Sequence, residues 1–173
     1  MAKFSAIITL SSLLFVCSCT ELRYATASFR SARKVAPKIK NRETVVIMLS
    51  SDTKEDAKRF ISDLRTLGYN VKGDITSSYD VQKNKSVEDK YKQVLACGRN
   101  AEAEVVIMVE MRWLSGYSLV RSDRTHHYFE ANPPQSQIEI DILDVTKSKW
   151  MVFGNGVAVD EGKFHDALVE TFK

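Results

Sequence analysis

The chain has 173 residues, 44% of them hydrophobic and 27% charged, which favours one globular domain over a disordered polypeptide. The formal net charge of +3 is unevenly spread, because residues 19–43 carry seven basic and two acidic side chains, whereas residues 44–173 carry 17 basic and 20 acidic ones. Nucleic-acid-binding domains normally have a basic face on the fold itself. The mildly acidic body therefore argues against a nucleic-acid partner.

Residues 1–18 have the pattern of a secretory signal peptide. Lys3 is followed by the uncharged run 4–19, which is apolar at first and ends in small side chains. A membrane-spanning helix is the alternative, but it needs about 20 mainly apolar residues, and this run is shorter and contains Ser and Thr. We therefore expect residues 1–18 to be removed from the mature protein.

Cys17 and Cys19 stand at the end of this run. A disulfide between them would be strained, and a metal site would lack a nearby second group of Cys or His ligands. The sequence VCSC instead resembles the lipobox of bacterial lipoproteins, with aliphatic Val16 followed by two small residues and the acceptor Cys19. The resemblance implies cleavage between Ser18 and Cys19, and a diacylglyceryl group with palmitate-type chains on the thiol of Cys19.

Such a group would anchor the protein to a membrane, since two or three acyl chains bind far more stably than one. Thr20 stands where Asp would resemble an inner-membrane retention signal, so the resemblance implies the outer membrane, with the protein facing the periplasm. Residues 19–43 are predicted to form a basic tether. The tether is either a solvated, partly helical spacer or a basic amphipathic helix on an anionic leaflet. In the second case its apolar side consists of Leu22, Ala25, Phe29, Ala32 and Ala36.

The chain beyond the tether first alternates strands and helices. The run 44–50 is apolar and rich in β-branched residues, as in a buried strand. A helix with one apolar face follows, which is predicted to begin at Asp52 or Thr53 and to end at Gly68. A short strand comes next, at 69–73.

A polar loop over 74–85 leads into a second helix. Ser86 and Asp89 have the spacing of a capping box at its start, and Gly98 is predicted to end it. The strand predicted at 103–114 is apolar at first and alternates later, as when one face of a strand meets solvent.

The second half of the chain is predicted to be antiparallel. Residues 117–131 indicate a strand or a hairpin, and residues 136–145 alternate isoleucines with acidic residues, as when one face of a strand is buried. A turn then leads to a return strand at 150–159 and to a terminal helix at 163–173.

The order β-α-β-α-β-β-β-β-α predicts a single α/β (α+β) domain at residues 44–173. We expect a mixed sheet of about five to six strands, with helices packed mainly on one face. The stretches DLRTLGYNV, RNAEAEVVIMVEM and IEIDILDVTKSKWMV resemble the small periplasmic domains of three groups. These are the TolB N-terminal domain, the LpoB-type activators and the CsgG-type secretion lipoproteins. The resemblance implies this architecture and the binding of other proteins, and it carries over no functional residue.

The chain also departs from each of these groups. It has no propeller repeats like TolB and no Pro-rich tether like the LpoB-type proteins. The stretch SLVRSDRTHHYFEA is too charged for the lipid-facing hairpins of the CsgG type. The resemblance therefore concerns architecture more than the activity of any one group.

Candidate catalytic and metal-binding groups are few. His126 and His127 are adjacent, so in a strand they would point to opposite faces, which favours solvated histidines over a metal site. His165 is predicted to lie on the surface of the terminal helix. Cys97 is predicted to be a buried thiol rather than a nucleophile, because Arg99 is its only basic neighbour in sequence. No catalytic motif is present and the carboxylates fall mostly on faces predicted to be exposed, so we expect no catalytic residue, no metal or other cofactor, and no enzyme activity.

Aromatic residues beside charged positions are the remaining candidates. Trp113, Tyr117 and Tyr128 are candidate contacts for a protein partner, because aromatic side chains often anchor interfaces. The alternative is that Trp113 and Trp150 complete the core.

Together these observations predict a membrane-anchored periplasmic lipoprotein that acts as a protein-binding or envelope-assembly module. Its contact surfaces would be the loops at 74–85 and 115–136, because loops on a rigid sheet often carry function. The alternatives are an envelope hydrolase with an unrecognised site and an auxiliary subunit of a transport or secretion complex. A deep pocket with perturbed titratable groups would favour the hydrolase, and a stable oligomer would favour the subunit.

Overall fold

The computed structural model describes residues 29–50, 53–83, 86–114, 117–122, 127–131, 135–160 and 163–173. Its helices are α2 (Arg30–Ile39), α3 (Thr53–Thr66), α4 (Val87–Asn100) and α5 (Phe164–Phe172), and two short 3₁₀ turns are η1 (Thr76–Ser78) and η2 (Val81–Lys83). Its strands are β1 (Thr44–Leu49), β2 (Val71–Asp74), β3 (Val105–Leu114), β4 (Tyr117–Ser122), β5 (His127–Ala131), β6 (Gln135–Asp144) and β7 (Lys149–Asp160). The elements expected between residues 44 and 173 are therefore present, and α2 precedes them.

Five strands form one mixed sheet in the order β2-β1-β3-β6-β7. β1 runs parallel to β2 and β3, whereas β3, β6 and β7 pair in antiparallel fashion. The parallel pairs are joined through α3 and α4, because a crossover between parallel strands needs a long connection. The predicted α/β (α+β) class with a mixed sheet of about five strands is confirmed.

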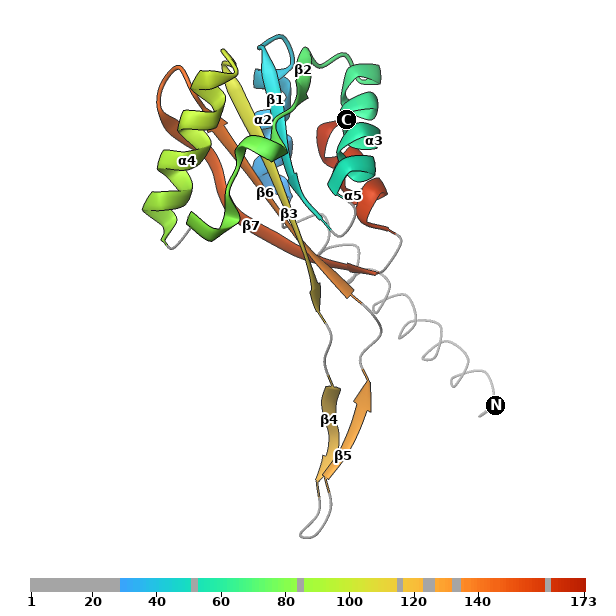
Figure 1. Cartoon of the computed structure of the whole chain (residues 1–173). Coiled ribbons are helices and arrows are strands. Elements are labelled where there is room, and N and C mark those ends of the chain that lie inside the picture. The colour runs from blue at the N-terminus through green and yellow to red at the C-terminus, as the bar shows by residue number, and fades with distance from the viewer. Residues whose placement is uncertain are drawn as a thin grey trace, which may run out of the picture.

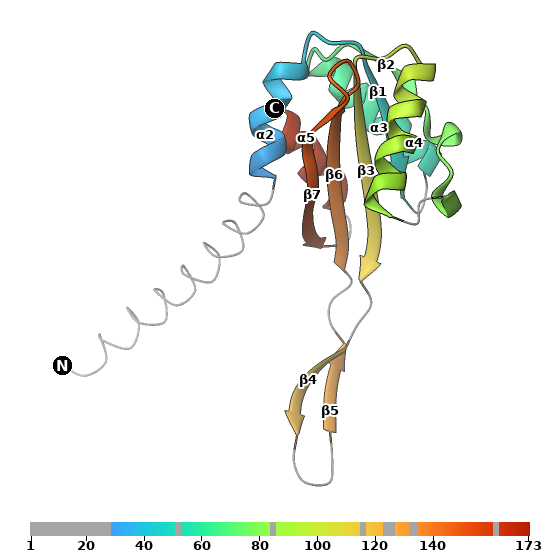
Figure 2. The same cartoon turned by 90° about the vertical axis from the view of Figure 1, so that its left-hand side faces the viewer.

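Helices cover both faces of this sheet (Figures 1 and 2). On one face, α2, α3 and α5 enclose a core that includes Phe60, Leu64, Ile107 and Phe172. On the other face, α4 and the η1 region enclose a smaller core. Three of the four described α-helices therefore share one face, as expected, while α4 lies on the second with the η1 region.

β1 shows why the sheet needs cover on both sides. Val46 and Met48 belong to the larger core, whereas Val45 and Ile47 belong to the smaller one. All four are at most 1% exposed. Successive side chains of a strand point to opposite faces, so a continuous apolar run is suited to a strand that is buried on both sides.

Local signals correctly predicted two of the helix ends. The Ser86 hydroxyl accepts a hydrogen bond from the backbone N–H of Asp89 at 3.1 Å, which is the predicted cap of α4. Gly68 follows the end of α3 with φ of +86°, a conformation that glycine adopts without steric cost. The prediction that Gly98 ends the next helix is wrong, because α4 continues to Asn100.

Gly98 has a packing role inside α4 instead. A Cβ at this position would lie 2.7 Å from methyl carbons of Val106 and of Val145. Only glycine therefore lets α4 approach β3 and the turn after β6 this closely.

α2 corrects the predicted domain boundary. Residues 19–43 were expected to form a tether, yet Phe29, Ala32, Ala36 and Ile39 are at most 3% exposed and join the larger core. α2 packs against α5, β6 and β7, and small alanines let its backbone lie close to them. The described part of the expected tether is thus part of the domain, and its apolar side is covered by protein rather than by lipid.

β4 and β5 form a separate two-stranded antiparallel sheet, which confirms a hairpin within 117–131. Its register opposes Leu119 to Phe129 and Tyr117 to Ala131. Figures 1 and 2 both show this β4–β5 hairpin extending beyond the end of the five-stranded sheet, away from the helices.

Candidate functional site

Three carboxylates meet on the face of the sheet that α4 covers. On β3 the residues facing α4 are Val106, Met108 and then Glu110, as the period of two requires. The register of the β3–β6 pair opposes Met108 to Asp141 and Glu110 to Glu139. The α4 face therefore changes from apolar to acidic toward the end of β3 nearest the hairpin.

Lys90 of α4 reaches into these carboxylates. Its Nζ lies 2.6 Å from Oε1 of Glu110, 2.6 Å from Oδ2 of Asp141 and 3.2 Å from Oε1 of Glu139. We call these four residues the Lys90 cluster. The side chain of Lys90 is 8% exposed and that of Asp141 is 1% exposed, while Glu139 at 24% is the most accessible member.

Burial and ion pairing act in opposite directions on these groups. Burial alone would lower the pKa of Lys90, but hydrogen bonds and charge attraction from Asp141 and Glu110 outweigh it and raise that pKa. Burial raises the pKa of Asp141, although Lys90 opposes the change. Burial, reinforced by the charge of Glu110, raises the pKa of Tyr79 to about 12. At neutral pH Lys90 is therefore a fixed cation and Tyr79 a neutral phenol.

The cluster is also closed from the side of β7. The backbone N–H of Gly154 donates a 2.7 Å hydrogen bond to Oδ1 of Asp141. Gly154 has φ of +70° and lies where the β6–β7 register shifts, so the bulge turns its N–H toward the carboxylate. Asp141 is thus held from both sides, by an ammonium and by a backbone donor.

The chemistry that this arrangement allows is limited. The oxygens of Glu110, Glu139 and Asp141 all lie within 4.8 Å of one another, a spacing that can suit a divalent cation. The ammonium of Lys90, however, contacts all three carboxylates and already supplies a positive charge among them. Because Lys90 is held in its charged form, it is poorly suited to act as a base or a nucleophile. The cluster is best explained as an internal clamp between α4 and the sheet.

Aromatic side chains border the cluster. Nζ of Lys90 lies 5.6 Å from the ring centroid of Phe153, which is 39% exposed. Trp150 packs against Phe153 at 5.2 Å and against Tyr91 at 6.2 Å between ring centroids. Trp150 is half-buried against the smaller core, which confirms that it completes the core rather than standing free.

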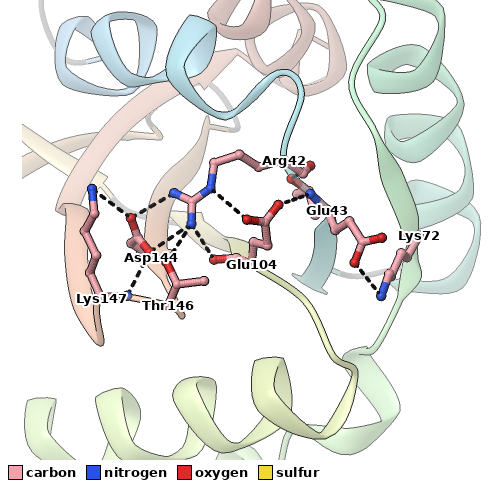
Figure 3. Close-up of polar contacts among 8 residues, drawn as sticks. Arg42, Glu43, Lys72, Glu104, Asp144, Thr146 and Lys147 are labelled. Atoms are coloured by element: carbon pink, nitrogen blue, oxygen red, sulfur yellow. Dashed lines mark hydrogen bonds and ion pairs between the residues drawn. The ribbon is translucent and has the colours of Figure 1, made fainter.

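A second polar network lies at the end of the sheet opposite the Lys90 cluster, where it joins the segment between α2 and β1 to the end of β6 (Figure 3). The guanidinium of Arg42 donates to both carboxylate oxygens of Asp144, at 2.8 and 2.9 Å, and to the hydroxyl of Thr146 at 3.0 Å. Asp144 also accepts from the backbone N–H of Lys147 at 3.0 Å. The hydrogen bond from Arg42 is the main reason that the pKa of the Asp144 carboxyl lies well below its usual range.

The same network continues across β1 and β2. A carboxylate oxygen of Glu104 lies 3.8 Å from Nε of Arg42, and Glu104 also accepts from the backbone N–H of Glu43 at 3.0 Å. Lys72 of β2 pairs with Glu43 at 2.8 Å, as Figure 3 shows. These contacts fix the entry to β1 and thereby hold α2 against the domain, so their role is structural.

His165 lies in a buried contact, and the prediction that it is a surface residue is wrong. It is 7% exposed, and its Nε2 contacts Oδ2 of Asp63, which links α5 to α3. Cys97 is 6% exposed and its thiol donates to the carbonyl of Ser78 at 3.2 Å. This low exposure confirms the prediction of a buried thiol, and burial raises the pKa of the thiol.

The predicted partner contacts lie along one part of the fold. Trp113 belongs to β3 next to its end, Tyr117 begins β4 and Tyr128 lies in β5. The backbone thus brings Tyr117 and Tyr128 into the β4–β5 hairpin and places Trp113 on the strand that leads to it. His127 also lies in β5, while His126 falls outside the described residues.

Ser18 and Cys19 also lie outside the described part of the chain. Among the residues that the structure describes, no helix combines the length and hydrophobicity that a bilayer-spanning segment requires. No family model, curated protein sequence or solved structure matches this chain.

Proposed function

We propose that this protein is a lipid-anchored bacterial lipoprotein that holds a rigid α/β domain in the periplasm and binds another envelope protein through the β4–β5 hairpin. The lipobox-like sequence that ends at Cys19 supports the anchor and the location, most simply at the outer membrane. The geometry of the hairpin supports the binding role.

The hairpin is the observation that carries this proposal. It is a sheet of only two strands, and within the described residues the outer edges of β4 and β5 pair with no further strand. An isolated two-stranded hairpin is at best marginally stable in water, and open strand edges readily pair with another chain. A hairpin that extends away from the core is therefore suited to gain its stability from a partner, by adding strands or by packing.

The body of the domain suits the role of a support. Both faces of the five-stranded sheet are covered, and ionic networks clamp α4 at one end and the start of β1 at the other. Lys90, whose pKa is raised by its carboxylate partners, is already engaged in ion pairs within the Lys90 cluster. This favours a binding module over a hydrolase.

Site-specific photocrosslinking in intact cells tests the proposal. A photoreactive amino acid is placed at Tyr117, at Tyr128 or, as a control, at Lys92 on the exposed side of α4. We expect discrete adducts with an envelope protein from the two hairpin positions and none from Lys92. Adducts with a second copy of this chain would instead favour the subunit of an oligomeric complex. Adducts from Lys92 alone would overturn the assignment of the hairpin.

A further inference from the structure

α2 carries a row of basic residues on its outer side, and no ion pair joins them to another residue in the described part of the chain. Arg30, Lys34 and Lys38 follow one another at intervals of four, so they form one ridge along the helix, and all three are exposed. The opposite side of the helix is the one buried in the larger core. We call these three residues the basic ridge.

Among the described residues, acidic neighbours do not neutralise the basic ridge. Residues 30–40 contain five basic and no acidic side chains. Glu170 of the adjacent α5 pairs with Lys173 at 2.9 Å and with Arg33 at 3.9 Å, and no ion pair joins it to the ridge in the described part of the chain. Because residues 44–173 carry an excess of acidic side chains, the ridge is a local positive surface on an otherwise mildly acidic domain.

The ridge also lies close, along the chain, to the proposed anchor. Arg30 lies eleven positions after Cys19. Such a segment spans about 16 Å as a helix and at most about 40 Å when fully extended. A membrane that holds Cys19 is therefore within reach of the ridge, and basic residues near an anionic surface are attracted to it.

We propose that the basic ridge of α2 binds the anionic headgroups of the leaflet that holds Cys19, so that the domain lies with α2 toward the membrane. This inference rests on the proposed lipid anchor. It differs from the expected surface helix in that the apolar side of α2 packs on the domain, and only charged side chains meet the lipid. The acidic remainder of the domain is repelled from the same surface, which favours one orientation.

Vesicle co-sedimentation tests the inference without the anchor. The probe protein is the mature chain with Cys19→Ser, made without residues 1–18, so that no acyl chain contributes. Vesicles of phosphatidylglycerol and phosphatidylethanolamine are compared with vesicles of phosphatidylcholine alone. We expect binding to the anionic vesicles only, with loss of binding in about 1 M salt, where the screening length falls to about 3 Å.

Charge-reversal variants identify the surface. The variant K34E/K38E should bind anionic vesicles at least about thirtyfold more weakly, from about one kcal/mol per basic residue at the surface. The control K83E/K92E changes the net charge equally on η2 and α4, away from α2, and should bind almost like the parent. Circular dichroism verifies that both variants fold. The inference would be overturned if the parent protein bound neutral and anionic vesicles equally. It would also be overturned if both variants lost the same amount of affinity for anionic vesicles.

The outcome also separates this inference from the proposed function. If the Cys19→Ser protein bound neither lipid mixture, while Cys19 was lipidated in cells and the hairpin gave adducts, only the membrane-binding role of the basic ridge would be refuted. Capture of an acidic protein by the ridge in place of lipid would refute it as well, and would leave the anchor intact.

Discussion

Replacing Lys90 by Met should strongly destabilise the domain at neutral pH. The substitution keeps much of the aliphatic stem and removes the ammonium that contacts Glu110, Glu139 and Asp141. Removing one partner of a buried ion pair leaves uncompensated charge and costs about 3–5 kcal/mol. We expect a loss of that size, because Lys90 and Asp141 are almost fully buried.

The expected magnitude follows from the spacing of the carboxylates. Their oxygens lie within 4.8 Å of one another, and two unit charges at that distance repel by about 3.5 kcal/mol at an effective dielectric constant of 20. The folded variant should therefore take up at least one proton. A carboxyl group with an ordinary pKa of about 4 costs about 4 kcal/mol to protonate at pH 7.

This proton uptake determines how the effect depends on pH. In the variant the carboxyl pKa of the folded state lies above that of the unfolded state, so the folded state binds more protons and loses stability as the pH rises. As the pH falls from 7 to 5, the deficit of the variant in free energy of unfolding relative to wild type should shrink. The change should be about 1.4 kcal/mol per pH unit for each proton that the folded variant takes up.

Urea denaturation at pH 7, 6 and 5, followed by circular dichroism, measures both effects. Lys92→Met on the same helix is the matched control, because its side chain is 66% exposed and pairs only with Glu88 among the described residues. The control should change the free energy of unfolding by less than about 1 kcal/mol. If the Lys90 variant were as stable as this control at pH 7, or if its deficit did not vary with pH, the account of the cluster would be wrong.

Three further predictions concern packing, the Arg42 network and the domain boundary. Gly98→Ala should lower the free energy of unfolding by about 1–3 kcal/mol in urea denaturation, because the added Cβ would overlap methyl groups on β3 and after β6, and an unchanged midpoint would contradict this. Arg42→Met should cost about 2–3 kcal/mol at pH 7. Because Arg42 lowers the folded-state pKa of Asp144, this contribution is present above about pH 4 and fades below it, so a difference from wild type that persists in acid would refute the pairing. A chain limited to residues 44–173 lacks the buried side of α2 and should lose the cooperative thermal unfolding that a chain of residues 20–173 retains. Equal melting temperatures of the two chains would instead support the prediction that α2 belongs to a tether outside the domain.

Patterns that depend on neighbours in sequence were predicted well. The cap at Ser86, the αL residue Gly68 and the alternation of β6 are set by bonds and periods within a few residues, and all three are confirmed. The fold class followed from the order of such elements, since few topologies accommodate it.

Features that depend on which face of the sheet a helix covers were not predicted. Glu139 and Asp141 alternate with isoleucines, a pattern usually seen when polar residues meet solvent, but α4 covers that side of the sheet. One signal was present in the sequence: Lys90 lies four residues before Val94 and seven before Cys97, and thus on the buried side of its helix. A lysine at that position requires anionic partners.

α2 was misassigned for a related reason. Two of the three buried side chains of α2 are alanines, which make a weak apolar pattern, and its basic residues suggested a solvated tether. Small side chains can nevertheless be fully buried when they allow close packing against other elements. Likewise, nothing near His165 in sequence indicates its contact with Asp63, because the two residues are 102 positions apart.

The lipid anchor is the claim on which location and orientation both depend. Mass spectrometry of the amino-terminal peptide of the protein, purified from its native envelope, tests it most directly. We predict a mature chain that begins at Cys19 and carries two or three acyl chains. A chain that retains residues 1–18, or an unmodified Cys19, would contradict the account.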